Sequence, residues 1–481
     1  MPERKRVAVL ADSDTRWKWG ALTARRLVPD HQLTGFLLRG RATPTARQLG
    51  EVGVRADRLS EVTCAEFLAE IERERYDVVV LALVGGAVQA VLHGARALWP
   101  APAGRPVFVT GYVGVVYEKL ADGLLLRHGA DLVLANSRHD AQRFRAVYEG
   151  VGADAAAVTE TALPFLGGAP YEQAGSRAHT VVFAVQPSVP DRRADRAYLL
   201  ERAAGHARLH PEREVLIKLR SKPGEHTTHL EEQPYQRLAE RLPGGLPANC
   251  RLVYGNMGEV LDGTDLLVTV SSTAALESLH RSVPTAILTD LGIRESLGNH
   301  HFLGSGCLAS WDQIDSGLLP QGDPVWLAAQ GVLPPAGADG RADRGVDRGA
   351  DRGADGRAER RADGRAERRA DGPAERSTDE GAGPDAYALA RAKVAGLLAA
   401  ARLPSPAPYY TLTTAPGYLP GILARHHLAP DGTPLPGAVR PAAGESRLRR
   451  RLRSHLREAA RGAYRHGVQR VAPVIRRLGE L

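Results

Sequence analysis

The stretch Asp265–Leu288, DLLVTVSSTAALESLHRSVPTAIL, predicts a strand, a polar turn, a helix and a second strand. Its leading residues are leucine-rich and β-branched over the length of a buried strand. The triplet Ser271-Ser272-Thr273 supplies hydroxyls that suit a helix N-cap, and Pro284 ends the helix. A helix that begins just past a parallel strand presents free backbone N–H groups and a positive dipole end, which suits a phosphate. The stretch therefore predicts one unit of a nucleotide-binding α/β fold.

Apolar strands alternate with helix-compatible segments on both sides of this stretch. This alternation indicates parallel sheets covered by helices on both faces. A segment rich in Gly, Ala, Pro and Ser, Gly167–Ala178, separates two such series. We therefore predict two doubly wound, Rossmann-like domains, 1–170 and 178–330, whose strands point their carboxyl ends into a shared cleft. The predicted strands are Arg6–Ala11, Gln32–Leu38, Tyr76–Leu83, Pro106–Tyr112 and Ala130–Ala135 before the hinge, and Thr180–Val185, Glu212–Leu219 and Asn249–Val253 after it.

The remaining third of the chain has a different composition. Residues 335–381 are short charged repeats with almost no large apolar side chains, so we predict a disordered segment. Residues 385–402 predict a helix that packs on the core, and 403–444 a Pro-rich connection. The tail 445–481 is expected to be a basic amphipathic helix, bound to anionic lipid or else solvated or docked on a partner.

The charge is concentrated in that tail. It carries eleven Arg against three Glu, which accounts for the whole formal net charge of +8. A neutral body with one basic end excludes a generally basic nucleic-acid-binding surface. No apolar run reaches the roughly 18–20 residues of a membrane-spanning helix, and the N-terminus lacks an apolar leader. We therefore expect a cytoplasmic protein, peripheral at the inner face of the plasma membrane if the tail binds lipid.

The three cysteines bear on the kind of site to expect. Cys64, Cys250 and Cys307 are far apart and form no paired motif. This spacing argues against a zinc ribbon or a disulfide scaffold and fits a reducing compartment.

The predicted donor side begins with the Ser271-Ser272-Thr273 turn, which could bind a donor phosphate or could simply cap a helix. Glu277, one helical turn further, could accept hydrogen bonds from ribose hydroxyls or could be a solvated helix residue.

A basic loop after the predicted strand Glu212–Leu219 adds cations. Alternation places Lys218 and Arg220 on the same side, where they could neutralise a diphosphate leaving group, with His226 as a further donor. The alternative is a basic loop without a ligand. A metal set of His226, His229 and Glu231 is disfavoured because three ligands in one loop form a weak pattern.

The loop after the first predicted strand holds the candidate base. Asp12 or Asp14 could deprotonate an acceptor hydroxyl, while Trp17 or Trp19 stacks on an acceptor sugar. The alternative is an Asp cap with both tryptophans in the core.

Further candidates follow later strands. Glu118 is a second possible base and Tyr112 a possible acceptor contact, both after the predicted strand Pro106–Tyr112. Asn136-Ser137 suits a plain helix cap, and His300-His301 could reach the cleft from the second domain.

The two-domain layout and the segments ADLVLANSRHDAQRF and TVSSTAALESLHRSVPTAIL resemble GT-B glycosyltransferases. The Ser-Ser-Thr turn with its upstream basic loop is distantly similar to polysialyltransferase and capsule-type enzymes. A nearer likeness, over about residues 5–315, is to actinobacterial proteins described as glycosyltransferases of the DUF6716 type. The basic loop reads Lys-Pro-Gly-Glu-His where polysialyltransferases have a His-Pro pair, so a CMP donor does not follow. Their acidic Asp/Glu-Asp/Glu-Gly motif is missing, so the base stays open.

This resemblance implies metal-independent, cofactor-free transfer of a sugar from a nucleotide-activated donor held by the second domain. The implied donor contacts are the Ser271-Ser272-Thr273 turn with Glu277, Lys218 and Arg220. The acceptor would be a glycan or a lipid-linked or cell-envelope molecule. Alternatives are a sugar-nucleotide epimerase or polyol-phosphate transferase of the same fold, and a non-catalytic nucleotide-binding protein.

Overall fold

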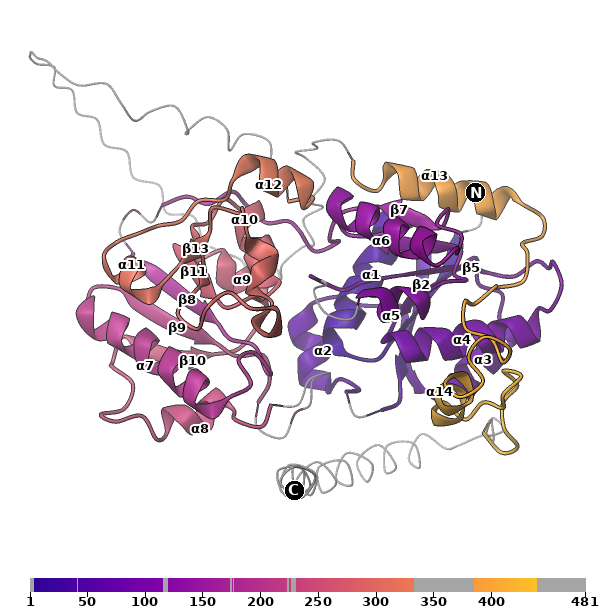
Figure 1. Ribbon diagram of the computed structural model, residues 1–481, viewed down its shortest axis with the longest axis horizontal. Helices are drawn as coiled ribbons and strands as arrows, with labels where there is room; N and C mark the ends of the chain where they lie inside the picture. The colour runs from indigo at the N-terminus through magenta and orange to yellow at the C-terminus, as the bar shows by residue number, and fades with distance from the viewer. Residues whose placement is uncertain are drawn as a thin grey trace, which may run out of the picture.

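The computed structural model describes residues 4–40, 42–115, 120–173, 175, 177–222, 225, 231–332 and 385–438. The predicted repeats at 335–381 and the predicted tail helix at 445–481 lie outside these residues. Figure 1 shows two α/β domains side by side, with the last two described helices on the N-terminal one.

The N-terminal domain is built on a seven-stranded parallel sheet of order β3-β2-β1-β4-β5-β6-β7. Its strands are β1 (Lys5–Ala11), β2 (His31–Leu38), β3 (Arg58–Val62), β4 (Val78–Ala82), β5 (Val107–Gly111), β6 (Leu132–Ala135) and β7 (Val158–Glu160). The helices that connect them are α1 (Asp14–Leu27), α2 (Ala46–Val52), α3 (Cys64–Arg73), α4 (Gly85–Leu98), α5 (Leu120–Leu125) and α6 (Arg138–Gly150).

The C-terminal domain repeats this plan with a six-stranded parallel sheet of order β10-β9-β8-β11-β12-β13. Its strands are β8 (Thr180–Ala184), β9 (Glu214–Lys218), β10 (Cys250–Val253), β11 (Leu266–Thr269), β12 (Thr285–Leu288) and β13 (Leu308–Ala309). The helices are α7 (Arg193–Leu209), α8 (Tyr235–Ala239), α9 (Met257–Leu261), α10 (Ala274–His280), α11 (Trp311–Asp315) and α12 (Pro324–Ala329), with 3-10 turns η1 (Glu295–Leu297) and η2 (Asn299–Phe302). The prediction of two Rossmann-like domains in a GT-B-like α/β protein is confirmed.

Both sheets reverse their strand order beside their first strand. The reversal falls between β1 and β4 in one domain and between β8 and β11 in the other. In open α/β sheets this switch point, at the carboxyl ends of the strands, is where ligands bind. The two switch points therefore define where a site is to be sought.

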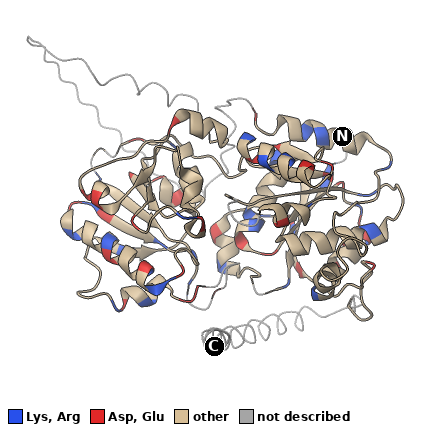
Figure 2. Cartoon of the chain, viewed as in Figure 1, with Lys and Arg blue, Asp and Glu red and all other residues tan. Residues whose placement is uncertain are grey.

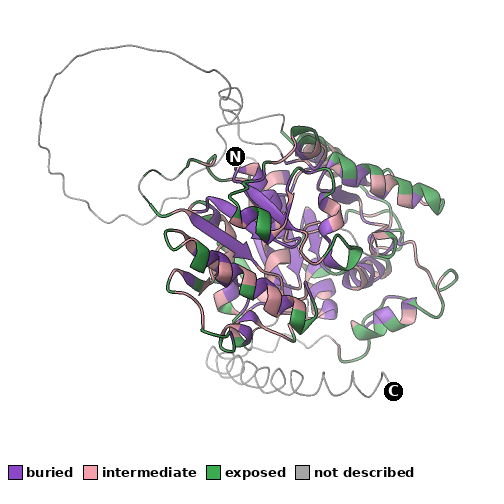
Figure 3. Cartoon of the chain, turned by 60° about the vertical axis from the view of Figure 1, so that its left-hand side comes forward, coloured by how far each residue is buried: buried purple, intermediate pink, exposed green. Residues whose placement is uncertain are grey.

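The burial of the strands explains why they could be predicted from the sequence. Every residue of β4 and β8 is buried, because helices cover both faces of each sheet. Figure 3 shows the buried strands inside and the exposed residues on the outer faces of the helices. The edge strand β3, RLSEV, is polar and partly exposed, and the sequence analysis missed it for that reason.

The C-terminal arm belongs to the N-terminal domain. Helix α13 (Ala388–Ala399) contacts β7 and α1, and α14 (Leu419–Arg425) contacts α4. Leu419, Leu423 and Leu428 are no more than 1% exposed and join the core beneath α4. The described part of the predicted Pro-rich connection 403–444 thus contains α14, which was not predicted, and its apolar side chains complete a core.

The surface charge of the two domains is mixed, and their helices are short or polar. Figure 2 shows Lys and Arg interspersed with Asp and Glu over both domains. Within the described ranges no helix is both long and apolar enough to cross a membrane.

Candidate functional site

The carboxyl ends of the two sheets meet through three ion pairs. Arg220, two residues past β9, donates to Asp14 at the start of α1, with Nη2 2.7 Å from Oδ1. Lys18 of α1 lies 3.4 Å from Glu277 of α10. Arg47 of α2 binds Glu225 through both of its carboxylate oxygens. Residues far apart in the sequence thus converge where both switch points face each other.

Asp12 bridges the N-terminal switch point. Its Oδ1 accepts from Arg16 Nη1 and its Oδ2 from the backbone N–H of Val84, both at 2.9 Å. Val84 precedes α4, so the carboxylate ties the end of β1 to the loop after β4. Both oxygens have partners within the N-terminal domain, whereas the other predicted base, Asp14, is bonded across to the C-terminal domain.

Asp14 is the predicted base that faces the other domain. Ser13 caps α1 by accepting from the N–H of Arg16, so Asp14 occupies the first helical turn. Burial raises the pKa of the Asp14 carboxyl, but the Arg220 charge and hydrogen bond outweigh burial and hold that pKa below its ordinary value. While Arg220 is bound, Asp14 is a weak base.

Lys218 ends β9 and is buried, with 9% of its surface exposed. Its Nζ donates to the carbonyl of Leu219 at 2.8 Å, and no described carboxylate lies within ion-pair distance. Its acidic neighbours Glu51 and Glu277 are each bound to another cation. Burial lowers the pKa of Lys218 to about 8. A buried cation without its own counter-ion is costly, which favours an anionic ligand here.

The Ser271-Ser272-Thr273 turn bridges the C-terminal switch point. The Gln186 side chain, just past β8, accepts from the N–H of Ser271 at 3.0 Å, and the Ser271 hydroxyl donates to Leu297 at 2.5 Å. Ser271 is 2% exposed, so its predicted role as a phosphate donor is wrong for the side chain.

Ser272 and Thr273 differ from Ser271 in being only half-buried. The Ser272 hydroxyl accepts from the N–H of Ala274 at 3.2 Å, while Thr273 makes no capping hydrogen bond. A Cβ on Gly114, in the loop after β5, would lie 2.6 Å from the Thr273 hydroxyl oxygen. Glycine at that position therefore lets the N-terminal domain approach the turn.

Glu277 is buried in α10 and directed at the N-terminal domain. Its carboxylate pairs with Lys18, whose ammonium also lies 4.8 Å from the Phe165 ring centroid. It is not the solvated helix residue of the alternative interpretation.

The predicted acceptor contacts are contradicted by burial. Trp17 and Trp19 are each 1% exposed in the core between α1 and the sheet, and Trp17 donates to the Val54 carbonyl. The Tyr112 hydroxyl is buried, and its ring packs on Phe144 and beneath Arg127. Both indole rings of α1 lie in the core, so neither tryptophan can stack on a sugar, and the Tyr112 ring is already packed against Phe144 and Arg127.

Two further predicted residues, Glu118 and His226, lie outside the described residues. The roles assigned to them as second base and donor contact stay predictions.

The sequence analysis missed Asp140. Ser137 caps α6 as predicted, and Asp140 in that first turn is 5% exposed. Burial raises the pKa of Asp140 to about 6, against the opposing charge of Arg143. A carboxylate in the first turn after a helix cap is common in sequences, so nothing in the sequence signals that Asp140 is buried.

His301 lies near the same helix from the other domain. Burial, followed by the charges of His139, Arg143 and His300, lowers its pKa to about 4. The interface thus continues from α1 to α6.

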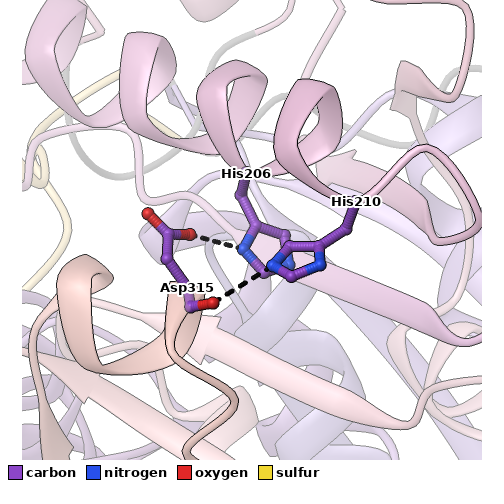
Figure 4. Close-up of side chains that lie close together, drawn as sticks. All are labelled: His206, His210 and Asp315. Carbon is purple, nitrogen blue, oxygen red and sulfur yellow. Dashed lines mark hydrogen bonds and ion pairs between the residues drawn. The ribbon is translucent and has the colours of Figure 1, made fainter.

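A His/Asp cluster with metal-ligand spacing lies elsewhere, between α7 and α11 (Figure 4). His206, His210 and Asp315 offer ligand atoms within 4.8 Å of one another. However, His206 Nδ1 lies 2.6 Å from Asp315 and its Nε2 3.3 Å from Arg213. A neutral His206 that donates at Nδ1 and accepts at Nε2 satisfies both bonds, and burial lowers its pKa toward that form. We interpret the cluster as a hydrogen-bonded clamp between two helices.

Comparison with known proteins gives one family match. A family model described as "Putative glycosyltransferase (DUF6716)" matches residues 7–344, which spans both sheets. No curated protein sequence matches the chain.

Several solved structures resemble the chain at low identity. The S. aureus MnaA-UDP co-structure is 11% identical, with 69% of this chain and 91% of that chain covered and a TM-score of 0.46. A UDP-GlcNAc 2-epimerase from Methanocaldococcus jannaschii is 11% identical, covering 68% and 97%, with a TM-score of 0.44. A UDP-glucosyltransferase from Polygonum tinctorium is 13% identical, covering 68% and 88%, with a TM-score of 0.43.

Proposed function

Because this chain belongs to the DUF6716 family, described as a glycosyltransferase family, we propose that it transfers a sugar from a nucleotide-activated donor to an acceptor hydroxyl. The observation that carries the proposal is Lys218, a buried cation with no ion-pair partner in the described residues. It ends β9, next to the C-terminal switch point, and its electrostatic neighbours include Glu51 of the N-terminal domain.

The donor diphosphate would bind Lys218 and Arg220. Their two positive charges would stabilise the negative charge that develops on the leaving group. Ser272 and Thr273, which are half-buried, would contact the phosphates. Glu277 would give up its ion pair with Lys18 and accept hydrogen bonds from the ribose hydroxyls instead. In this arrangement protein cations neutralise the phosphates, so we propose transfer without a metal ion.

Asp14 would be the base from the N-terminal domain. Its carboxylate lies next to Arg220 at the meeting point of the two sheets, while Asp12 is occupied by structural bonds. The acceptor, proposed as a glycan or a lipid-linked or cell-envelope molecule, would enter beside α1.

A binding screen tests the donor side. We expect one of UDP, GDP, CMP or CDP to raise the melting temperature, and the variant Lys218→Met to lose that shift. Gln236→Ala, at a residue of α8 that is bonded to Ser221 and Tyr254, is the matched control and should keep it. If no nucleotide shifts wild-type melting, the proposal fails.

Product analysis tests the reaction. Transfer requires an acceptor and should persist in EDTA, whereas an epimerase would convert its sugar nucleotide without any acceptor. Conversion of the donor sugar in the absence of acceptor would replace our proposal with epimerisation.

A further inference from the structure

Arg220 stands between the proposed donor site and the proposed base. Its Nη2 donates to Asp14 and also to the hydroxyl of Thr15, although these residues are 206 and 205 positions away in the sequence. Its side chain is 29% exposed and that of Asp14 is 13% exposed. A solvent-accessible guanidinium that holds a carboxylate through one nitrogen can exchange it for a phosphate, which it can bind through two nitrogens.

The charge pattern along α1 makes this contact selective. Asp14 and Lys18 are four residues apart and therefore lie on one helix face. Across the interface they meet Arg220 and Glu277, so each domain presents one acid and one cation to the other. A diphosphate that binds next to Lys218 would compete with Asp14 for Arg220, because both are anions. It would not compete with the cation Lys18, which is paired with Glu277.

The effect on Asp14 follows from its surroundings. Burial raises the pKa of its carboxyl, and Arg220 is the largest of the opposing influences, followed by hydrogen bonds from Thr15. Once Arg220 turns to another anion, burial acts with less opposition and the carboxylate gains basicity.

We propose that Asp14 and the donor diphosphate compete for Arg220, so that donor binding releases the Asp14 carboxylate to accept the acceptor's proton. The inference rests on the proposed function and adds the order of events: the donor binds first, and Asp14 then becomes available as the base. The acceptor oxygen bonds to the anomeric carbon as its proton passes to Asp14. The bond from that carbon to the diphosphate oxygen breaks, and the nucleoside diphosphate leaves with the electron pair, held by Lys218 and Arg220.

The test measures nucleotide affinity by calorimetry, with whichever of UDP, GDP and CDP binds the wild type most tightly. Removing the competing charge in Asp14→Asn should tighten binding roughly threefold to fivefold, the range of a partly exposed ion pair. Arg220→Gln should weaken binding. In the double variant, Asp14→Asn should give no gain, because its effect acts through Arg220.

The double variant also separates competition from simple repulsion. A gain that persists without Arg220 means that Asp14 repels the ligand directly, and the proposal is overturned. Lys18→Gln breaks the other ion pair between α1 and the C-terminal domain, the one with Glu277. An equal gain in affinity in that variant would assign the effect to a loosened interface and would also overturn the proposal. Asp14→Ala serves as a second variant if Asp14→Asn does not keep the wild-type circular dichroism spectrum.

The outcomes separate this inference from the proposed function. Nucleotide binding that weakens in Arg220→Gln but is unchanged in Asp14→Asn keeps the proposed function and refutes the competition. If CMP alone binds the wild type, the competition for a diphosphate is refuted and the proposed function stays, whereas both fail if no nucleotide binds.

Discussion

The two domains share one strand order but close their switch points with different chemistry. A carboxylate, Asp12, joins the loops in the N-terminal domain, and its charge is balanced locally by Arg16. A neutral amide, Gln186, does the same in the C-terminal domain. Within the described residues neither Lys218 nor Arg220 is ion-paired with an acid of its own domain, because Glu277 is bound to Lys18. One strand order thus carries a charge-balanced edge in one domain and, in the other, an edge with two cations at which we propose that phosphate binds.

Among single substitutions at the two edges, the largest expected effect is at Asp14. Asp14→Asn should lower the transfer rate roughly 10²- to 10⁴-fold, the usual contribution of a general base. Its stability should stay within about 1 kcal/mol of wild type, because the pair with Arg220 is partly exposed. Rate measurement at saturating donor, together with thermal melting, checks both. An unchanged rate would assign the base elsewhere, with Asp140 and Glu118 as the next candidates.

Lys218 tests the opposite edge. Lys218→Met should weaken nucleoside diphosphate binding roughly 30- to 100-fold, since one charge-assisted contact is lost from a buried position. Wild-type affinity should also fall as pH rises through about 8, where burial places the pKa of the ammonium and the charge is lost.

The control for that pH dependence is Lys218→Arg. A guanidinium keeps its charge throughout this range, so the affinity should become nearly independent of pH. An identical fall in this variant would show that another group titrates.

Substituting Asp12 or Gln186, which join the loops at the two switch points, should have a smaller effect, and this effect is on the free energy of unfolding. Asp12→Ala should cost about 2 kcal/mol, because the Val84 N–H and Arg16 lose a charged acceptor, and Gln186→Ala about 1 kcal/mol. Chemical denaturation compares them. Equal losses would mean that the charge of Asp12 contributes nothing beyond its hydrogen bonds.

The smallest expected effect is at the far side of the interface. His301 has its pKa lowered to about 4, so at pH 5 the unfolded chain binds more protons there than the folded one. Stability from this residue is present above the ordinary pKa and is lost as pH falls through about 6.5 toward 4.

His301→Gln should therefore reduce the loss of stability between pH 7.5 and pH 5 by about 1 kcal/mol, after allowance for partial exposure. Melting curves of both proteins at the two pH values measure this difference. An unchanged pH profile would mean that His301 titrates normally.

Much of the fold was predictable because its strands are buried on both faces. A run such as VVVLA in β4 must be apolar at every position, and the sequence shows it directly. The edge strands β3, β7 and β13 and the Leu419–Leu428 part of the arm were not predicted, since their burial depends on distant partners, whereas the edge strand β10 was predicted.

The site was only partly predictable for a related reason. Polar residues just past a strand are candidates by position, which found Asp14, Lys218 and Arg220. Position does not tell which of two neighbouring groups is already bonded. Asp12 and Ser271 have structural partners at Val84 and Leu297, and Trp17 is in the core.

Two α/β units, their strand ends and the kinds of charge placed there follow from local periodicity and composition in the sequence. Which of these charges meet depends on the packing of the two domains. Arg220 reaches Asp14 and Lys18 reaches Glu277 across separate domains, and no local pattern encodes a contact over two hundred residues. The physical reason is that side-chain pairing at an interface depends on how two independently built sheets are oriented.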